Sequence, residues 1–508
     1  MTISRQKIIF ALALIVLLGL FLRLYDLHGN GLWLDEGGSV MKTDADLKQF
    51  MSGRQPYISP PLYYLFLGSW IKFFGSSEIS IRFPSVLFGT LSILMLYRIG
   101  KIVFDETAGL IGALIIATST FQIYFSQEAR MYSLLLLLSL SSIYYFILLL
   151  MEGVVTIREE KRKIRWVPAL FYLLSSILLL YTHNFGISPL IVQNILALVL
   201  ILKTRRIGRM KLKIWVILQS ILLLAFLPWI VVIIKQFFNI QGNYWSPPVT
   251  PGILRETLLS FSGSYWLLVF FLTFSIISLI LNLSPQKPKS LYVKTHGEDK
   301  SPLPVPLFLF TWLSVPCLLP FLISVFSTPI YISRITISAS PALYLMAAGG
   351  IRLFKKTSWI IVSLCLFALL SIPVLWNYYH TTRNEPMQEV ISRVEDEVQP
   401  GDIILISPFW YKKFIFDYYY ARKDIPAQGF SSGIITPEAL KELTDLSEEY
   451  RRIWIILCQG EDFSPLLRNK FPIRFSPSDS RIINYFNFQA GKEMAIRVYL
   501  LNNHSPRI

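Results

Sequence analysis

The sequence predicts a polytopic α-helical membrane protein with about eleven transmembrane helices and a water-soluble α/β domain at its C-terminus. Of its 508 residues, 53% are hydrophobic, and the mean hydropathy is +0.51. A soluble chain of this length needs far more polar surface to cover its core. Apolar runs of about 17 to 21 residues also recur along the chain, and this is the length that crosses about 30 Å of hydrocarbon.

The eleven predicted spans alternate with polar segments as far as residue 376. Their approximate ranges are 8–24, 84–104, 108–125, 131–150, 167–183, 187–203, 214–234, 262–283, 306–326, 336–352 and 359–376. The first span follows a basic start (Arg5, Lys7), and no small-residue cleavage site comes after it. We therefore interpret it as a retained span and not as a signal peptide.

The formal net charge of +16 belongs to the membrane part of the chain. Residues 377–508 hold 16 Lys and Arg against 17 Asp and Glu, whereas residues 1–376 hold 32 against 15. If the N-terminus is cytoplasmic, the inner segments carry 20 basic residues and the short outer segments carry four. This bias predicts a multi-pass protein of the plasma membrane with an extracytoplasmic C-terminal domain. It also explains the charge without a nucleic-acid partner.

We expect two domains, residues 1–376 in the membrane and residues 377–508 outside it. The outer loop 25–83 contains an apolar run, Leu62–Phe74, that is too short to span and follows two prolines. We expect an interfacial or re-entrant helix there. In the C-terminal domain we expect strands and a helix, at Asp402–Ser407, Arg452–Cys458 and Ala495–Leu501 for the strands and at Pro437–Leu446 for the helix. The domain has no nucleotide-binding motif, and an accessory lid or an acceptor-binding module suits it.

Polar side chains gather at the predicted outer ends of spans that are far apart in the sequence. They are Asp35 and Glu36 after span one, Arg82 at span two, Glu128, Arg130 and Tyr132 between spans three and four, His183 at the end of span five, and Arg334 before span ten. Charged groups at this depth are costly and therefore suggest function. Arginine binds phosphate through a planar fork of donors, and a carboxylate can accept a proton from an attacking hydroxyl. The set suits transfer of a sugar from a lipid phosphate to an alcohol.

Each of these side chains also has a structural explanation. The acidic pair could be solvated loop charge, and Glu128 could pair with Arg130 across its turn. His183 could be a satisfied interfacial histidine, and the two remaining arginines could extend to lipid head groups. The sequence requires no cofactor, although the carboxylates together with His183 leave a divalent metal open.

Four motifs in this order resemble the family 39-type glycosyltransferases. They are Asp35-Glu36, then Ser59-Pro60-Pro61-Leu62-Tyr63-Tyr64, then Ile81-Arg82-Phe83-Pro84-Ser85, then Gln127-Glu128-Ala129-Arg130-Met131-Tyr132-Ser133. These enzymes have the GT-C fold and include protein O-mannosyltransferases and lipid A aminoarabinose transferases. The resemblance covers about residues 8–200. The segment Tyr331–Gly350 is similar to the family's later outer-loop arginine and the proline-containing span that follows it.

The resemblance implies a GT-C-like transmembrane catalytic domain. Such an enzyme moves a hexosyl or pentosyl group, with inversion, from a polyprenyl- or dolichyl-phosphate donor to a hydroxyl on a protein, lipid or glycan. Asp35 matches the family's presumed catalytic base and Glu36 the second half of that pair. Glu128 and Arg130 match the loop motif near the donor phosphate. Many members carry His where this chain has Ser59, so that role is absent or belongs to another group such as His183.

Two other classes of function stay open on the sequence. A transporter or flippase for a lipid-linked sugar would use the same polar residues as a substrate path, but transporters place their sites near the bilayer midplane. A non-catalytic cell-envelope assembly protein would use the C-terminal domain for binding. Eleven spans with convergent acids and arginines are more than an anchor requires.

Overall fold

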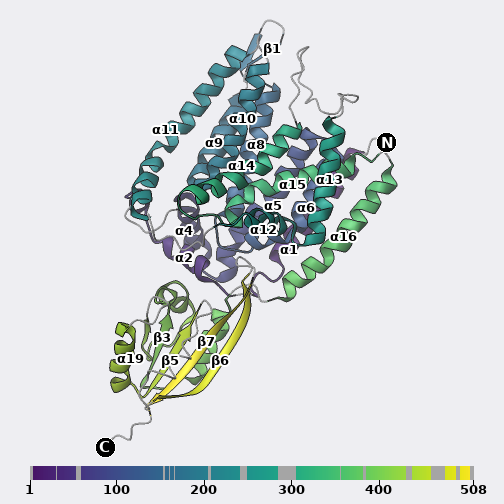
Figure 1. Ribbon diagram of the computed structural model, residues 1–508. Coiled ribbons are helices and arrows are strands. Elements are labelled where there is room, and N and C mark those ends of the chain that lie inside the picture. Colours follow the sequence, from purple (N-terminus) through teal and green to yellow (C-terminus); the bar gives the residue numbers. More distant parts are fainter. Residues whose placement is uncertain are drawn as a thin grey trace, which may run out of the picture. The chain divides into compact units, whose positions relative to one another are not determined.

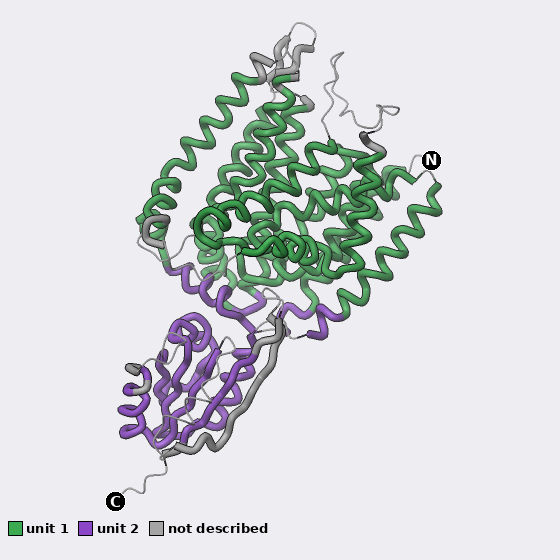
Figure 2. The backbone as a smooth tube through the Cα atoms, viewed as in Figure 1, with its two compact units in different colours: residues 1–25, 45–76, 80–376 green, residues 26–44, 77–79, 377–508 purple. Residues whose placement is uncertain are grey.

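The computed structural model describes most of the chain. The described residues are 4–29, 31–52, 59–152, 155–158, 161–164, 166–203, 208–240, 249–283, 305–354, 356–381, 385–430, 437–458, 475–487 and 492–503. The chain forms two compact units, which Figure 2 colours separately. Unit 1 comprises residues 1–25, 45–76 and 80–376, and unit 2 comprises residues 26–44, 77–79 and 377–508. Unit 2 therefore unites two pieces of the first loop with the C-terminal part of the chain.

Unit 1 is a bundle of apolar helices (Figure 1). Six helices are long and apolar enough to cross a membrane, namely α1 (Arg5–Leu24), α5 (Glu78–Val103), α8 (Tyr132–Glu152), α11 (Gly208–Ile240), α14 (Val305–Phe326) and α16 (Thr357–His380). Two more candidates are bent pairs, α6 (Glu106–Thr118) with α7 (Thr120–Ser126) at 61° and α12 (Gly252–Ser262) with α13 (Tyr265–Leu283) at 92°. The chain is a multi-pass membrane protein with six to eight candidate spans among its described residues.

The predicted count of eleven is larger because three of the predicted spans form short helices. α9 (Trp166–Thr182) and α10 (Ile187–Lys203) have 17 residues each, and α15 (Ser340–Arg352) has 13. At 1.5 Å per residue these helices extend about 26 Å and about 20 Å, less than the 30 Å hydrocarbon core. The 3₁₀ helix η1 (Asn184–Gly186) joins α9 to α10, and the 3₁₀ helix η3 (Ser333–Ala339) leads into α15.

Smaller elements complete unit 1. Helix α3 (Leu47–Met51) is followed by α4 (Leu62–Phe74), which begins directly after Pro61, as the sequence predicts for the first loop. A two-stranded antiparallel hairpin, β1 (Val155–Arg158) and β2 (Lys161–Ile164), lies between α8 and α9. It falls in a segment that the charge pattern predicts as a basic inner loop.

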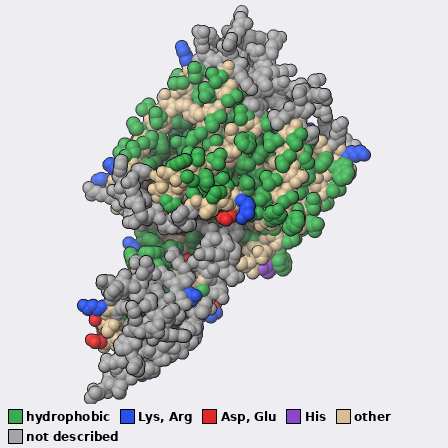
Figure 3. Space-filling model, viewed as in Figure 1, with side chains coloured by type: hydrophobic (Ala, Val, Ile, Leu, Met, Phe, Trp, Pro, Cys, Tyr) green, Lys and Arg blue, Asp and Glu red, His purple; other side chains and the backbone are tan. Residues whose placement is uncertain are grey.

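Helix α15 is almost entirely buried, although it is among the shorter helices of the bundle. All residues from 340 to 351 are buried. A Cβ atom at Gly350 would lie 1.9 Å from the Phe274 carbonyl oxygen of α13, and small residues permit such close packing between membrane helices. In contrast, α16 exposes Leu369 and Trp376, and hydrophobic side chains cover much of the visible face of the helices in Figure 3. An exposed apolar surface of this kind suits contact with lipid.

Unit 2 contains a five-stranded mixed sheet, in agreement with the α/β character that the sequence predicts. The strands are, in spatial order, β4 (Ala427–Gly429), β3 (Asp402–Ser407), β5 (Arg452–Leu457), β7 (Lys492–Asn503) and β6 (Phe475–Asn487). β3 pairs in parallel with β4 and β5, and β7 pairs antiparallel with β5 and β6. The three predicted strands correspond to β3, β5 and part of β7, and the predicted helix corresponds to α19 (Pro437–Glu449).

Apolar side chains cover both faces of this sheet, because alternate residues of a strand point to opposite sides. Ile404 belongs to a cluster that includes residues of α17 (Met387–Glu397) and of the π-helix η4 (Lys412–Phe416). Leu405 belongs to a second cluster, which includes residues of α19. Unit 2 is therefore a sheet with helices on both faces.

The first loop contributes the helix α2 (Leu34–Lys42) to unit 2. Leu34 packs against the Ile404 cluster. The π-helix η4 continues directly into the short helix α18 (Asp417–Tyr419). The acidic motif that follows the first span thus lies in the same compact unit as the C-terminal sheet.

Candidate active site

The turn between α7 and α8 is polar and buried. Helix α6 ends at Thr118, and Ser119 caps α7 by accepting a hydrogen bond from the Gln122 N–H. α7 has only seven residues, so the chain reaches residues 127–131 after two helical turns. Gln127, Glu128 and Arg130 are each less than 9% exposed. Because α6 and α7 are bent relative to each other and α7 is short, the polar turn that follows α7 lies buried inside the bundle.

Arg23 of α1 stabilises this bend, and the sequence analysis did not select it. Its side chain is fully buried and donates to the Ile116 and Ala117 carbonyl oxygens at 3.1 and 3.0 Å, and to Ser126 Oγ at 3.1 Å. The last carbonyls of a helix lack intrahelical partners, and Arg23 supplies donors to those of α6. In return, Gln127 donates to the Tyr25 carbonyl oxygen beyond the end of α1 at 2.7 Å. An arginine inside an otherwise apolar span was the signal available in the sequence.

Four of the predicted site residues come together from three distant segments. The Cζ atoms of Arg130 and Arg334 lie 5.8 and 5.7 Å from the centroid of the Tyr132 ring. The His183 ring lies 6.0 Å from the same ring, centroid to centroid. All four side chains are less than a tenth exposed. We call this group the arginine cluster (Arg130, Tyr132, His183, Arg334).

Each member of the arginine cluster sits at the end of a helix. Tyr132 is the first residue of α8, and Arg334 lies in η3. η3 is held by α14, since Trp312 Nε1 donates to the Ser338 carbonyl oxygen at 2.7 Å. His183 precedes η1, where Trp229 of α11 donates to Asn184 Oδ1 at 3.0 Å. The bundle thus fixes three loop segments around one aromatic ring.

The histidine of the cluster has a defined tautomer. The Phe185 N–H donates to His183 Nδ1 at 3.0 Å, so Nδ1 is an acceptor and carries no proton. The ring nitrogen Nε2 therefore holds the proton and is a donor.

Arg82 and Glu128 are buried beside the same turn. Arg82 is 2% exposed and lies in α5, three residues before Ser85. Ser85 Oγ donates to the Arg130 carbonyl oxygen at 3.2 Å, which joins α5 to the turn. Glu128 is 1% exposed, and its carbonyl oxygen accepts from the Arg130 N–H at 2.8 Å. Both residues therefore belong to the segments that surround Arg130.

The acidic pair lies in unit 2, in the first turn of α2. The two carboxylates differ in their surroundings, because Glu36 is fully buried whereas Asp35 is partly exposed. The Asp35 carbonyl oxygen accepts a hydrogen bond from Ser39 Oγ at 2.9 Å within the helix. Of the pair, Asp35 is the one that solvent or a substrate can reach.

The segment of the chain that contains the α7–α8 turn matches a known protein family. Residues 58–232 match the sequence profile described as dolichyl-phosphate-mannose-protein mannosyltransferase. Over this region, which is about a third of the chain, the sequence is similar to that family. The matched residues include the α7–α8 turn and His183. No individual curated protein sequence matches the chain.

Solved structures match the fold of this chain over nearly its whole length. ArnT from Cupriavidus metallidurans bound to undecaprenyl phosphate has a TM-score of 0.57 and 10% identity, with 97% of this chain and 98% of that chain covered. The oligosaccharyltransferase from Archaeoglobus fulgidus, tethered with an acceptor peptide, has a TM-score of 0.55 and 11% identity, with 89% and 69% covered. At these identities the matches show a shared GT-C fold.

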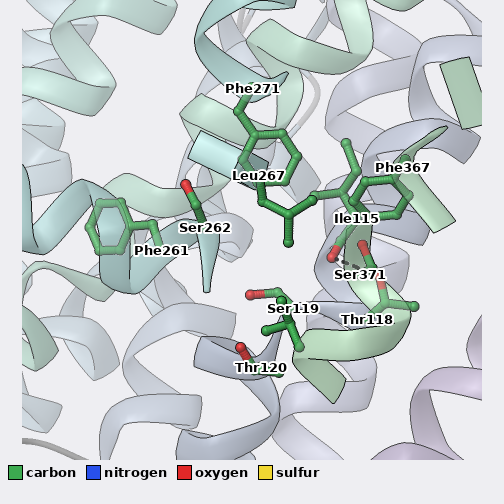
Figure 4. A pocket seen from close by; sticks show the side chains of 11 residues that line it. Ile115, Thr118, Ser119, Thr120, Phe261, Ser262, Leu267, Phe271, Phe367 and Ser371 are labelled. Atoms are coloured by element: carbon green, nitrogen blue, oxygen red, sulfur yellow. Dashed lines mark hydrogen bonds between the residues drawn. The ribbon is translucent and has the colours of Figure 1, made fainter. Parts of the chain in front are cut away.

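A small pocket lies apart from the predicted residues. Figure 4 shows it between the α6–α7 break and α12, α13 and α16, lined by apolar side chains and by hydroxyls such as Ser119, Ser262 and Ser371. None of the eight predicted site residues is among its lining residues. Its hydroxyls carry no charge that would recognise a phosphate.

Metal ligands were also left open by the sequence. Within the described ranges, no group of three or more His, Cys, Asp or Glu side chains is placed to hold a metal ion. The arginine cluster presents guanidinium groups, which bind phosphate oxygens through paired N–H donors.

Proposed function

We propose that this protein transfers a sugar from a polyprenyl- or dolichyl-phosphate donor to a hydroxyl acceptor, with inversion, on the outer face of the membrane. The observation that carries the proposal is the arginine cluster, in which two buried guanidinium groups from distant segments meet at one tyrosine ring. Guanidinium groups bind phosphate oxygens through a planar fork of N–H donors. A lipid-linked phosphate is an anion that reaches such a site from the bilayer.

The charges match the change that the reaction produces. A sugar phosphodiester carries one negative charge, and the lipid phosphate monoester that leaves carries up to two. Arg82, Arg130 and Arg334 supply three positive charges against one from Glu128. Fixed charges aimed at the leaving phosphate stabilise the transition state more than the ground state. His183 Nε2–H adds a neutral donor for a phosphate oxygen.

The proposed chemistry is a single displacement. Asp35 accepts the proton of the acceptor hydroxyl as its oxygen attacks the anomeric carbon. The bond from that carbon to the phosphate oxygen breaks, and the lipid phosphate leaves with the electron pair. One displacement inverts the anomeric configuration. Glu36, which is fully buried, would support α2.

Two relatives support the substrate classes. The ArnT structure contains undecaprenyl phosphate, and the archaeal oligosaccharyltransferase has been captured with an acceptor peptide and with a dolichol-phosphate. A polyprenyl or dolichyl carrier and a protein, lipid or glycan acceptor are therefore the classes to test. The sugar, a hexose or a pentose, is to be identified by testing a panel of donors.

The proposal includes a topology of eleven crossings in the plasma membrane. α9, α10 and α15 would cross as short helices among longer ones, and the bent pairs would each count once. Basic residues then mark the cytoplasmic side, which contains the N-terminus. The α7–α8 turn, the acidic pair and the C-terminal domain would all face outward. Cysteine labelling of residues introduced at the β1–β2 hairpin and at α19 tests this orientation.

The deciding experiment uses the purified full chain in detergent. A panel of radiolabelled polyprenyl-phosphate sugars is incubated with a membrane extract as the acceptor source, with wild type and Asp35→Asn in parallel. Label in an acceptor with wild type alone supports the proposal and identifies the sugar. Release of lipid phosphate without labelled acceptor would indicate hydrolysis. No donor consumption by a folded protein, together with donor movement across vesicles, would favour a flippase.

A further inference from the structure

The segment that carries Asp35 is held by the C-terminal domain on both sides of that residue. The Leu32 N–H donates to Tyr419 Oη at 2.6 Å, three residues before Asp35. Leu34 packs against the apolar cluster of the sheet. On the other side, Gly37 approaches the π-helix η4 so closely that a Cβ atom would lie 1.9 Å from the Phe414 carbonyl oxygen. These contacts all lie within unit 2.

Tyr419 is the centre of the first contact. Its hydroxyl accepts from the Leu32 N–H and donates to Glu78 Oε1, so both of its hydrogen-bonding roles are used. The second oxygen of Glu78 lies 3.2 Å from His28 Nδ1. Glu78 is 7% exposed, and a buried carboxylate requires such partners. Tyr419 therefore ties two pieces of the first loop, at residues 28–32 and at residue 78, to the C-terminal domain.

The second contact depends on a π-helix that is itself anchored. Ile415 and Phe416 of η4 are buried in the sheet cluster. Tyr411, at the start of η4, is fully buried and donates to Glu385 Oε1 at 2.6 Å. Single π-helical turns are frequent at functional sites because the extra residue redirects the backbone. Here η4 presents the Phe414 carbonyl to Gly37.

α2 cannot hold this geometry alone. It has nine residues, and isolated helices shorter than about 12 residues are marginal in water. Without the contacts at Leu32, Leu34 and Gly37, the carboxylate of Asp35 would sample many positions. We therefore infer that the C-terminal domain positions Asp35 for proton transfer, with Tyr419 and the Gly37–Phe414 contact as its positioning elements. The inference rests on the proposed role of Asp35 as the base.

Two adjacent glycines provide a matched test. A Cβ at Gly37 meets Phe414, whereas a Cβ at Gly38 meets nothing within 4 Å. Both are in α2, and alanine favours the helix equally at either position. Gly37→Ala must displace α2 from η4, and a misplacement of about 1 Å can lower a rate by about 100-fold. We expect Gly37→Ala to lower kcat by about 10- to 100-fold with an unchanged KM for donor, and Gly38→Ala to resemble wild type.

Tyr419→Phe removes both hydroxyl hydrogen bonds while it keeps the ring. We expect a smaller loss of kcat, about 10-fold, again without a change in donor KM. A variant that only unfolds the protein would also lower the apparent kcat at an unchanged KM, because less enzyme is active, but it would lower the melting temperature as well. Thermal unfolding in detergent is therefore measured for all three variants. Equal turnover in Gly37→Ala, Gly38→Ala and wild type would overturn the inference.

Hydrogen exchange of the intact protein tests the contacts without any activity. Amides of residues 32–42 should exchange faster in Gly37→Ala and Tyr419→Phe than in wild type and Gly38→Ala. If wild type transfers no sugar but this exchange pattern appears, the domain contact stands and the proposed function fails. If transfer occurs and exchange in α2 is unchanged by either substitution, the positioning role fails and the proposed function stands.

Discussion

The arginine cluster and the acidic pair are held in place by different means. The cluster takes its residues from the ends of α8, α9 and η3, which are fixed by the packed helices of the bundle. The acidic pair lies on a nine-residue helix that takes its position from the C-terminal domain. In the proposed reaction, the arginine cluster would need a rigid surrounding to bind the lipid phosphate, whereas Asp35 as the base would have to remain accessible to the acceptor.

The arginine cluster and the acidic pair also differ in how deeply their side chains are buried. Arg130 and Arg334 are buried, as groups that bind a leaving phosphate in a dry site should be. Within the acidic pair, the half-exposed member is Asp35 and the fully buried member is Glu36. Neighbouring residues with the same chemistry therefore have different expected roles. Each of the following substitutions tests one side of this contrast.

The largest effect is expected within the acidic pair. Asp35→Asn removes the base and should lower turnover by about 10²- to 10⁴-fold, with donor binding and melting temperature close to wild type. Glu36→Gln should retain more turnover but lose stability, because it alters a fully buried group. Single-turnover transfer and thermal unfolding measure the two properties. Equal turnover in the two variants would contradict the division of roles.

The arginine cluster should follow. Arg130→Ala and Arg334→Ala should each lower turnover by about 10²- to 10³-fold, since each removes a donor to the developing phosphate charge. Lysine should restore little, because it lacks the planar fork. Arg98→Ala is the control, as its Cζ lies 5.9 Å from the Tyr144 ring centroid but its side chain is exposed. A loss in Arg98→Ala as large as in Arg130→Ala would contradict the assignment.

Arg23 should affect stability before chemistry. Arg23→Met removes the donors to the carbonyls at the end of α6 and leaves buried acceptors without partners. Each such group costs about 1 to 3 kcal/mol, so we expect a clearly lower melting temperature in detergent. Gln127→Leu removes the hydrogen bond from Gln127 to the Tyr25 carbonyl oxygen beyond the end of α1. It should lower the melting temperature by a smaller amount. A melting temperature unchanged in both variants would mean that the bend is held by apolar packing.

The smallest effect is expected for Asp402 of unit 2, which should change how the stability of the fold depends on pH. Burial raises the pKa of a carboxyl, but hydrogen bonds from Arg452, the Gln399 N–H and Trp454 hold the pKa of Asp402 below its ordinary range. A lowered pKa stabilises the fold above the unfolded value of about 3.9, and this contribution is lost as the pH falls through the folded value. Asp402→Asn should therefore speed hydrogen exchange of β3 at pH 7 and weaken the loss of stability below about pH 4. An acid transition identical to wild type would contradict this role.

Local patterns in the sequence predicted the elements well. Apolar runs became helices because an apolar segment in a membrane must satisfy its backbone internally. Two prolines marked the start of α4, and short β-rich runs marked β3 and β5. The predicted cluster residues Arg130, Tyr132, His183 and Arg334 were chosen from their places at span ends, and the structure brings them together. Their substrate-binding roles remain predictions for the experiments above.

Features that depend on distant contacts were not readable in advance. The α6–α7 bend follows from Arg23, which lies more than ninety residues earlier in the chain. The short length of α15 is compatible with a bundle only because Gly350 admits Phe274. A single sequence gives no signal for either pairing.

The sequence by itself determined the membrane class, the positions of the helices, the α/β character of the C-terminal domain and the polar residues at the span ends. These depend on composition and short-range periodicity, which act within a few residues. Only the tertiary structure decided that α2 belongs with the C-terminal sheet, and that Glu36 is fully buried whereas Asp35 is partly exposed. Both facts depend on close contacts with Phe414 and Tyr419, which lie almost 400 residues away in the chain. Such contacts depend on complementary shapes that exist only when the chain folds, and no local sequence pattern encodes them.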